Sequence, residues 1–519
     1  MAYIEIENVS FKYPQSNDFA LKNVNLSFEK GSVNLILGKS ASGKSTLLSL
    51  LCKEIAPNGD LTGDINISGA KVSFVHQNTE TSLVCDKVFS ELAFPLENMG
   101  CSREKISLKI AETACFFNIE DLFERNVSEL SGGQKRIVAL ASAMVCEPDL
   151  LVIDEPVSCL DPLSAENFIS ALIKINKELG VTIILSEHIS NGIIPHCDTV
   201  SFMENGKIIC AADTQNATRE ICKLGYSDFM PFYVRINEMF SLGKDVPLSV
   251  KDAKINFEKK FSSENITVNK IVENEKIGKI DKKKTALTVK DIYFAYSKNQ
   301  PFVLKSCDYS ACFGKVNAIL GCNGSGKSTL LKMIASVLKS IHGKVKIYGK
   351  VALMPQNPLD LFCEEKISKE LSDCDKDLIE KFEVEKIFDS HPYDISGGEA
   401  RMVAFVKVLS QKPDILLLDE PTAGCDIQNK KKQQQILREL ADNGVCVVLV
   451  SHDMEFVSEV SDSVSLIFNG EIVETLPKRD FFSSVSYYTT DAYKISRSVF
   501  ENSVTQDDVE YLLKRNGVL

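Results

Sequence analysis

The stretch Gly38-Lys-Ser-Ala-Ser-Gly-Lys-Ser-Thr46 decides the fold of this chain, and it returns as Gly321-Cys-Asn-Gly-Ser-Gly-Lys-Ser-Thr329. Both copies fit G-x-x-x-x-G-K-[ST], a phosphate-binding loop (P-loop) when a strand precedes it and a helix follows. The apolar run Val33–Leu37 and the leucine-rich run Leu47–Leu51 supply that context. Glycines let backbone N–H groups wrap phosphate oxygens, and the lysine adds a positive charge. Two copies in register make an ordinary turn a negligible alternative, so the sequence predicts two nucleotide sites.

Four further landmarks repeat in the same order, so the chain is a tandem duplication of one module. The first copy carries Gln77, Ser131-Gly-Gly133, Asp154-Glu-Pro156 and His188, and the second carries Gln356, Ser396-Gly-Gly398, Asp419-Glu-Pro421 and His452. From the glutamine to the Ser-Gly-Gly landmark the first copy uses 54 residues and the second 40. Such a difference is typical of a peripheral segment. We therefore expect two modules that share a core and differ on one face.

The composition is that of an ordinary multi-domain globular chain, which excludes collagen-like and disordered classes. The 519 residues are too many for one hydrophobic core. With 59 basic and 71 acidic residues the net charge is −12, which argues against a nucleic-acid partner. No apolar run could span a bilayer, and the N-terminus does not resemble a secretory signal. The 16 cysteines are scattered without a C-x-x-C pair, as expected of thiols in a reducing cytosol.

The alternation of buried strands with loops and helices predicts an α/β fold. The runs Leu150–Ile153 and Ile415–Leu418 are continuous apolar segments that stop at the acidic pairs, which is typical of strands buried on both faces. We expect two tandem P-loop domains. Each has a mostly parallel sheet core, a helical subdomain and a small C-terminal appendage.

The domain limits follow from charge and from helix-start signals. We expect a first module over 1–261, a charged linker over 262–285 that contains Glu273–Lys284, and a second module over 286–519. Ser249 and Thr505 each precede an acid by three residues and are read as helix N-caps of the two appendages.

An acidic pair ends a strand in each module, which is where P-loop proteins hold their metal. Asp154 and Asp419 are expected to bind Mg²⁺ through water. Glu155 and Glu420 follow them and are placed to orient or deprotonate an attacking water. The alternative is that the acids only end a strand before a proline turn.

With these motifs in this order, nearly the whole of both repeats resembles the ATP-binding cassette (ABC) family. Leu130-Ser-Gly-Gly-Gln134 and Ile395-Ser-Gly-Gly-Glu399 resemble its signature loops, which close over ATP held by the opposite module. The second copy departs with Ile395 and Glu399, and Glu399 puts a negative charge near that site. The resemblance implies that the two cassettes pair within one chain around two composite ATP sites, and we expect hydrolysis at both.

The resemblance also implies roles for single residues. Gln77 and Gln356 would be Q-loop residues that touch Mg²⁺. His188 and His452 would be switch histidines that contact the γ-phosphate. A single histidine after a strand is more often structural, but the matched position in both repeats favours the switch role. Tyr13 and Tyr296 look like platforms for adenine, with a core tyrosine as the alternative. The implied catalytic residues are Glu155, Glu420, His188 and His452. The implied Mg²⁺ ligands are Ser45, Gln77, Asp154, Ser328, Gln356 and Asp419.

The implied cofactors are ATP and Mg²⁺, and the ATP contacts are spread over both modules. In the first module they are Tyr13, Gly38, Ser40, Ala41, Ser42, Gly43, Lys44, Ser45, Thr46, Gln77, Ser131, Gly132, Gly133 and Gln134. In the second they are Tyr296, Gly321, Asn323, Gly324, Ser325, Gly326, Lys327, Ser328, Thr329, Gln356, Ser396, Gly397, Gly398 and Glu399.

Three cysteines lie in or beside these loops: Cys322 in the second P-loop, and Cys159 and Cys425 after the acidic pairs. Packing as small residues is the favoured reading. The alternative hypothesis is that a thiol reagent at Cys322 blocks ATP binding at the second site.

Three segments outside the catalytic motifs resemble the ATPases of energy-coupling-factor (ECF) transporters. They are Val84–Gly100 after the first Q-loop, Met354-Pro-Gln-Asn-Pro358, and an appendage formed by Leu224–Phe232 and Pro247–Val250. The first segment would line a groove for a helix of a membrane partner.

The ECF resemblance implies a peripheral complex on the cytoplasmic face of the cell membrane. Its other members are a transmembrane scaffold subunit and substrate-capturing membrane proteins for vitamins or transition-metal ions. The 14-residue difference suggests that the first groove, near Phe94, binds its helix more strongly than the second, near Leu361. The alternatives are another ABC importer, or a soluble tandem cassette protein that acts on the ribosome or nucleic acid.

Overall fold

The computed structural model describes residues 1–519 except 1–2, 15, 17, 68, 78, 158–159, 189–191, 244, 263–265, 272–284, 298–299 and 519. Most of the predicted linker 262–285, including Glu273–Lys284, lies outside the described residues, as does Cys159. The chain divides into two compact units, Met1–Ala253 and Lys254–Leu519. The domain limits expected from the sequence stay a prediction. Among the described residues, no helix is both long and apolar enough to cross a membrane.

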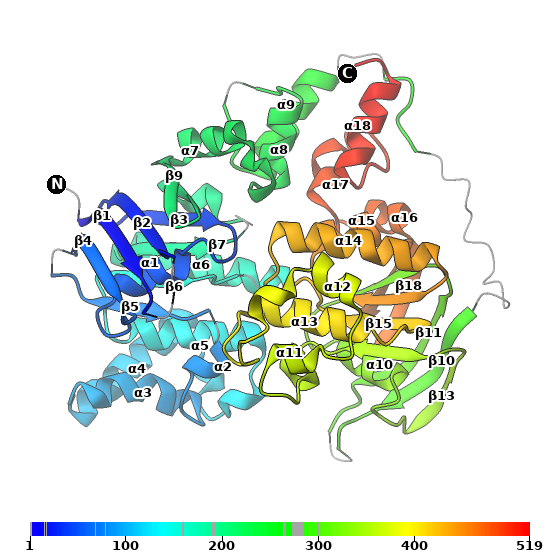
Figure 1. Ribbon diagram of the computed structural model, residues 1–519, viewed down its shortest axis with the longest axis horizontal. Helices are drawn as coiled ribbons and strands as arrows, with labels where there is room; N and C mark the ends of the chain where they lie inside the picture. The colour runs from blue at the N-terminus through cyan, green and yellow to red at the C-terminus, as the bar shows by residue number, and fades with distance from the viewer. Residues whose placement is uncertain are drawn as a thin grey trace. The chain divides into compact units, whose positions relative to one another are not determined.

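The first unit is built on a six-stranded sheet in the order β5-β6-β7-β3-β8-β9 (Figure 1). Its strands are β5 (Val72–Val75), β6 (Leu150–Asp154), β7 (Thr182–Glu187), β3 (Val33–Gly38), β8 (Thr199–Glu204) and β9 (Lys207–Asp213). All pairs are parallel except β8 with β9. A second, antiparallel sheet is formed by β1 (Ile4–Lys12), β2 (Leu21–Phe28) and β4 (Asp60–Asn66). Helix α1 (Lys44–Leu50) packs in one core with both sheets, since Leu48 shares that core with Ile184 and Ile6.

The second unit repeats this plan. Its mainly parallel sheet has the order β14-β15-β16-β12-β17-β18. The strands are β14 (Val351–Met354), β15 (Ile415–Asp419), β16 (Cys446–Val450), β12 (Val316–Leu320), β17 (Ser463–Phe468) and β18 (Glu471–Pro477). The antiparallel sheet contains β11 (Leu304–Cys312), β10 (Thr285–Phe294) and β13 (His342–Ile347). Helix α10 (Lys327–Ile334) follows the second P-loop. The predicted α/β class with mostly parallel sheets is therefore confirmed in both units.

The 14-residue difference between the modules falls in their helical segments. The first module has the long helices α3 (Val88–Asn98) and α4 (Arg103–Phe117), with a separate hydrophobic core beneath them. At the matching place the second has only α11 (Ile367–Glu370) and α12 (Lys376–Lys381). Short pieces complete this region: α2 (Thr79–Ser82), η1 (Glu120–Leu122), η2 (Val127–Glu129), η6 (Pro358–Leu361) and η7 (Val384–Ile387). The central sheets match strand for strand, so the difference lies outside them.

The remaining helices flank the sheets or form the appendages. In the first unit these are α5 (Gly132–Met144), α6 (Pro162–Leu179), η3 (Ile194–His196), α7 (Thr214–Ile221), η4 (Cys222–Tyr226), η5 (Ser227–Phe229) and α8 (Phe232–Met239). In the second they are α13 (Gly397–Leu409), α14 (Ile427–Asp442), α15 (Met454–Val460), α16 (Lys478–Ser484), α17 (Asp491–Ser496) and α18 (Gln506–Arg515). The predicted N-caps are confirmed, because the Ser249 and Thr505 hydroxyls accept N–H bonds at 3.1 and 3.2 Å.

Helix α9 (Val250–Phe261) follows the first module but packs mostly in the second unit. The Phe257 and Phe261 rings are fully buried, and the Phe257 ring meets the Phe500 ring edge-on at 6.2 Å. Beyond the helix, the Asn516 side-chain Oδ1 accepts from the Thr267 N–H at 2.8 Å. Figure 1 shows α9 beside α18. The part of α9 from Lys254 to Phe261 therefore lies in the same compact unit as the C-terminal appendage of the second module.

Candidate functional site

The first P-loop needs glycine at both ends for steric reasons. A Cβ on Gly38 would lie 2.2 Å from the Met203 carbonyl oxygen, so no larger residue fits where β3 ends. Gly43, just before α1, has φ +103°, and a Cβ there would lie 2.6 Å from the Ala20 carbonyl oxygen. Only glycine combines this backbone conformation with so close an approach. The loop therefore turns tightly from the central strand into the helix.

The P-loop lysines adopt the same arrangement in the two modules. The Lys44 ammonium donates to the carbonyls of Gly38 and Lys39 at 2.8 and 2.9 Å. The Lys327 ammonium donates to Gly321 and Cys322 at the same two distances. Both lysines are buried. Each cation is held at the centre of a loop whose helix N-terminus favours negative charge, so the local geometry suits a phosphate group.

The residues predicted to bind Mg²⁺ lie together at the ends of the strands. In each module the P-loop serine, Ser45 or Ser328, hydrogen-bonds to the aspartate at the end of the neighbouring strand, Asp154 or Asp419. Burial is the largest cause that raises the pKa of each aspartate above its usual range. Among the described residues the buried Asp419 Oδ1 has no hydrogen-bond partner. A hydroxyl and a carboxylate with a free buried oxygen form a hard-oxygen donor set that fits Mg²⁺.

The two predicted catalytic glutamates share an unusual backbone conformation. Glu155 has φ +45° and Glu420 has φ +50°, a left-handed region that non-glycine residues rarely adopt. Each N–H donates to the neighbouring strand, to the Ser186 carbonyl at 3.2 Å and to the Val450 carbonyl at 2.9 Å. These bonds hold the strained turn that projects each carboxylate from the end of its strand.

The surroundings of the glutamates differ between modules. The Glu155 carboxylate lies 2.5 Å from both the His188 Nε2 and the Gln77 Nε2. In the second module the His452 backbone N–H donates to one oxygen of the Glu420 carboxylate at 3.2 Å. The Nε2 of the His452 ring lies 3.4 Å from the other oxygen. Gln356 is exposed. Burial raises the pKa of Glu420 to about 8.

The predicted switch histidines reach their own P-loops, so they are not merely core residues. The His188 Nδ1 lies 3.2 Å from the Lys44 ammonium and 3.2 Å from the Gly38 carbonyl. The His452 Nε2 lies 3.0 Å from the Asn323 Oδ1. Each histidine therefore joins a catalytic-glutamate candidate to the phosphate loop.

The two predicted adenine platforms have matching contacts. The Tyr13 hydroxyl lies 3.0 Å from the Thr46 hydroxyl, and the Tyr296 hydroxyl lies 3.0 Å from the Thr329 hydroxyl. The rings are 38% and 57% exposed, so neither tyrosine belongs to the hydrophobic core. Each remains a candidate for stacking on a flat ligand at the end of the P-loop helix.

The signature segments start helices α5 and α13 with complete capping boxes. The Ser131 hydroxyl accepts the Gln134 backbone N–H, and the Gln134 side-chain Oε1 accepts the Ser131 backbone N–H at 3.0 Å. In the second copy the Ser396 N–H and hydroxyl both donate to the Glu399 carboxylate, at 2.8 and 2.7 Å. The replacement of Gln by Glu therefore keeps the cap but adds a charge beside Ser396.

The second glycine of each signature loop is under steric constraint. A Cβ on Gly133 would lie 2.5 Å from the Ser164 hydroxyl, and one on Gly398 would lie 2.6 Å from the Gly424 carbonyl. Gly133 therefore packs closely on the start of α6, and Gly398 on the loop after the second acidic pair, each within its own module.

Two buried ionisable residues near the first site were not predicted from the sequence. Arg136 donates to the carbonyls of His76 and Gln77 at 2.9 and 2.8 Å, which ties α5 to the Q-loop. The Glu187 carboxylate accepts the Val157 N–H at 2.9 Å, and burial raises its pKa to about 8. The contrast of Ser-Glu-His188 with Ser-His-Asp453 was the available signal for Glu187.

The cysteines near the sites behave differently from one another. Cys425 is buried, and its thiol lies 3.5 Å from the Pro421 carbonyl, which agrees with packing as a small residue. Cys322 is exposed, and its sulfur lies 3.0 Å from the Tyr488 hydroxyl.

The geometry defines a pair of P-loop ATPase modules, and the comparisons with known proteins give the family. A model described as ABC transporter matches residues 21–158 and 304–423. An ABC transporter ATP-binding protein of Bacillus thuringiensis is 34% identical and aligns over 98% of both chains. A protein of the same description from Clostridium tetani is 30% identical over 79% of this chain and 95% of its own. The chain therefore belongs to the ABC transporter family of ATP-binding proteins and is an ATPase that uses Mg²⁺.

Solved structures that align over nearly the whole chain support the fold. An archaeal ribosome recycling factor, solved with a ribosomal stalk protein, has a TM-score of 0.61 at 21% identity, over 92% of this chain and 91% of its own. A structure titled RNase-L inhibitor also has a TM-score of 0.61, at 20% identity, over 98% and 99% of the two chains. At this level of identity the likeness concerns the fold alone.

Proposed function

We propose that this chain is the ATP-hydrolysing motor of an ECF-type importer for vitamins or transition-metal ions. It would work at the cytoplasmic face of the cell membrane, with a transmembrane scaffold subunit and substrate-capturing membrane proteins. The segments Val84–Gly100, Met354–Pro358 and Leu224–Phe232 support the ECF assignment by their resemblance. The names of the full-length relatives, as ABC transporter ATP-binding proteins, support transport in general.

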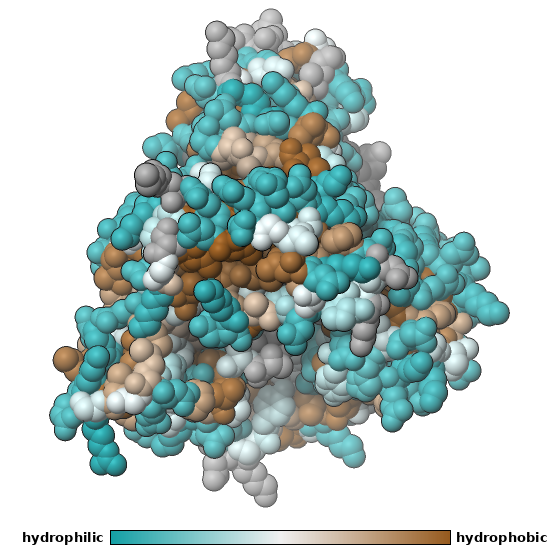
Figure 2. Space-filling view, turned by 60° about the vertical axis from the view of Figure 1, so that its left-hand side comes forward, coloured by the Kyte–Doolittle hydropathy of each residue, from teal (hydrophilic) through white to brown (hydrophobic). Residues whose placement is uncertain are grey.

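The observation that carries this proposal is a set of exposed apolar side chains beside the first Q-loop. Val84, Phe89, Phe94 and Met99 are 65, 42, 43 and 55% exposed, although most of the molecular surface in Figure 2 is hydrophilic. Helix α3 buries its other apolar residues, including Leu92 and Leu96, in the core of the helical segment. Large apolar residues left uncovered on one short segment are typical of a protein-binding surface. A helix of a membrane partner would cover them.

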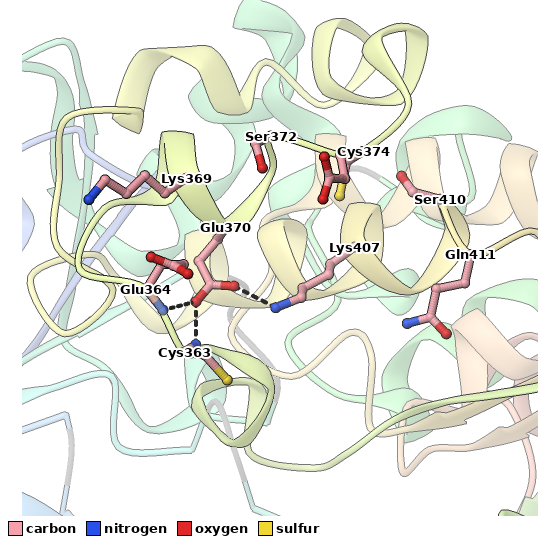
Figure 3. A pocket seen from close by; sticks show the side chains of 10 residues that line it. Cys363, Glu364, Lys369, Glu370, Ser372, Cys374, Lys407, Ser410 and Gln411 are labelled. Atoms are coloured by element: carbon pink, nitrogen blue, oxygen red, sulfur yellow. Dashed lines mark hydrogen bonds and ion pairs between the residues drawn. The ribbon is translucent and has the colours of Figure 1, made fainter.

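The corresponding region of the second module is polar, and it contains a pocket of about 350 Å³ (Figure 3). The buried Glu370 carboxylate accepts the N–H groups of Cys363 and Glu364, and the Lys407 ammonium lies 2.5 Å from its other oxygen. In the first module the buried Glu91 accepts the N–H groups before α3 in the same way. Both modules thus share an organising carboxylate, but their surfaces differ in polarity. This difference supports the prediction of unequal binding to two partner helices.

The two ATP sites are proposed to be composite, with the cassettes paired within one chain. One site would join Lys44, Ser45, Gln77, Asp154, Glu155 and His188 to Ser396 and Gly398. The other would join Lys327, Ser328, Gln356, Asp419, Glu420 and His452 to Ser131 and Gly133. Every catalytic residue type is present twice, which supports hydrolysis at both sites.

Within a site, this chain's own residues divide the work. The P-loop lysine and the N–H groups at the helix start would bind the phosphates, while the serine and aspartate would hold Mg²⁺, which neutralises phosphate charge when bound. The glutamate would accept a proton from the attacking water, and the histidine beside it would orient that carboxylate. The strained turn at Glu155 and Glu420 would aim each carboxylate.

Affinity purification of the tagged full chain from detergent-solubilised membranes tests the transport proposal. We expect small membrane proteins and a larger membrane subunit to co-purify with the wild type, and to be lost from Phe89→Asp/Phe94→Asp. Tyr348→Asp, also exposed but on neither helical segment, is the matched control. Purification with ribosomes and without membrane proteins would refute the importer and favour the soluble alternative.

A further inference from the structure

The second residue of the first P-loop is attached to the C-terminal appendage of its own module. The Lys39 ammonium lies 2.6 Å from the Glu204 carboxylate at the end of β8. The Tyr226 hydroxyl donates to the other oxygen of the same carboxylate. The Lys39 ammonium also lies over the Tyr226 ring, 5.7 Å from its centroid. Lys39, Glu204 and Tyr226 therefore form one connected network.

The second module repeats this contact with different side chains. Cys322 occupies the P-loop position of Lys39, and its sulfur lies 3.0 Å from the Tyr488 hydroxyl. Tyr226 and Tyr488 follow the last strand of their sheets by comparable distances, at the start of each appendage. Because both copies keep the tyrosine contact while the P-loop residue changes from lysine to cysteine, the contact itself is the common feature.

The position that receives this contact matters for phosphate binding. The carbonyl of Lys39 accepts from the Lys44 ammonium at 2.9 Å, and that of Cys322 accepts from the Lys327 ammonium at 2.9 Å. The same residue thus holds the P-loop lysine through its backbone and the appendage tyrosine through its side chain. A shift of the appendage would move the carbonyl that places the lysine.

We propose that Tyr226 and Tyr488 are positioning residues that set the ATP affinity of the P-loop in their own module. They act through Lys39 and Cys322, and neither needs to touch the nucleotide. Through these contacts the appendage of each module is connected to the phosphate loop of that module. This inference concerns ATP binding and does not depend on transport.

The Tyr226 ring is held independently of its hydroxyl, which permits a clean test. The ring packs on Phe202 at 4.5 Å and on Phe229 at 6.3 Å. Tyr226→Phe removes the hydrogen bond to Glu204 and keeps these contacts, so the thermal unfolding temperature should hardly change. Hydrogen bonds to charged groups are the stronger ones, so we expect about three- to tenfold weaker nucleotide binding at the first site. Tyr488→Phe should have a smaller effect, because its partner is a thiol.

The experiment titrates the purified full chain with Mg²⁺ and the non-hydrolysable analogue adenylyl imidodiphosphate in a calorimeter, and measures ATP turnover at saturating ATP. Tyr226→Phe should weaken one of two binding events and leave saturated turnover unchanged. Tyr487→Phe, a neighbouring tyrosine that is 92% exposed, is the control and should match the wild type. In a Lys39→Met background, Tyr226→Phe should cause no further loss of nucleotide affinity, because the Lys39–Glu204 ion pair that connects Tyr226 to the P-loop is already absent.

Affinity within twofold of the wild type in Tyr226→Phe would overturn the proposal. A fall in ATP turnover at saturating ATP without a change in nucleotide affinity would also overturn it. So would a further loss of affinity when Tyr226→Phe is added to Lys39→Met. The assay contains no membrane partner, so its failure would leave the importer proposal standing.

Discussion

The charge of the second signature loop leads to a quantitative prediction about the composite sites. Glu399 caps α13, and its carboxylate lies 2.7 Å from the Ser396 hydroxyl. In the proposed arrangement that hydroxyl binds the γ-phosphate of ATP held by the first P-loop. Replacing the carboxylate by the neutral amide found at Gln134 keeps the capping box and removes one negative charge. Glu399→Gln should therefore strengthen ATP binding at the first P-loop.

The size of the effect follows from the distance. A phosphate oxygen hydrogen-bonded to Ser396 would lie about 5 Å from the Glu399 carboxylate, and two unit charges at that separation repel by about 1 to 3 kcal/mol for a dielectric constant between 80 and 20. The loop is partly exposed, so the lower end applies, which is about fivefold in affinity. Salt should reduce the effect, since exposed charges are screened.

Binding of adenylyl imidodiphosphate with Mg²⁺, measured by calorimetry at low and at high salt, checks this prediction. Gln134→Glu is the reciprocal variant and should weaken the other site by a similar factor. If Glu399→Gln left both affinities unchanged at low salt, the signature loop of the second module would not face a triphosphate, and the composite-site reasoning would be wrong.

Three further predictions follow from the sites and surfaces. Glu155→Gln and Glu420→Gln should each slow ATP hydrolysis at the substituted site by at least about tenfold, since a general base typically contributes about 10²–10⁴-fold, so single-turnover assays should lose one of two hydrolysis events; full activity in either variant would exclude hydrolysis at that site. Burial raises the pKa of the Glu187 carboxyl from 4.5 to about 8 in the folded chain. Between these pH values the folded chain holds a proton that the unfolded chain has lost, so the free energy of unfolding falls as the pH rises. Glu187→Gln should flatten the pH dependence of the melting temperature there, and an unchanged slope would contradict it. Phe94→Asp should reduce assembly with membrane subunits more than Leu361→Asp in pull-downs. Equal losses would refute the prediction that the first module binds its partner helix more strongly than the second.

Local motifs account for what could be predicted from the sequence. The P-loops, the strands before them and the acidic pairs were recognised because glycine conformation, apolar runs and strand-end acids are properties of neighbouring residues. The N-caps at Ser249 and Thr505 were found for the same reason, since a cap involves residues only three apart. Repetition strengthened each of these predictions, because a motif that occurs twice in the same order rarely arises by chance.

Contacts between distant segments account for what was missed. The burial of Glu187 depends on the loop at Val157, and Arg136 reaches the Q-loop carbonyls some 60 residues away. The packing of Phe257 on Phe500 joins segments that nothing in the local sequence connects. The two Q-loop glutamines also differ in a way that the local sequence does not reveal: Gln77 contacts Glu155, whereas Gln356 is exposed.

By itself the sequence determined the class of the protein: a duplicated phosphate loop, each copy followed by its acids and histidine, specifies an ATPase of two modules. The tertiary structure alone decided which side chains surround those motifs, including the link from Lys39 through Glu204 to Tyr226. The physical reason is that backbone conformation and strand burial are set by adjacent residues, whereas side-chain partners depend on which elements the folded core brings within hydrogen-bonding distance.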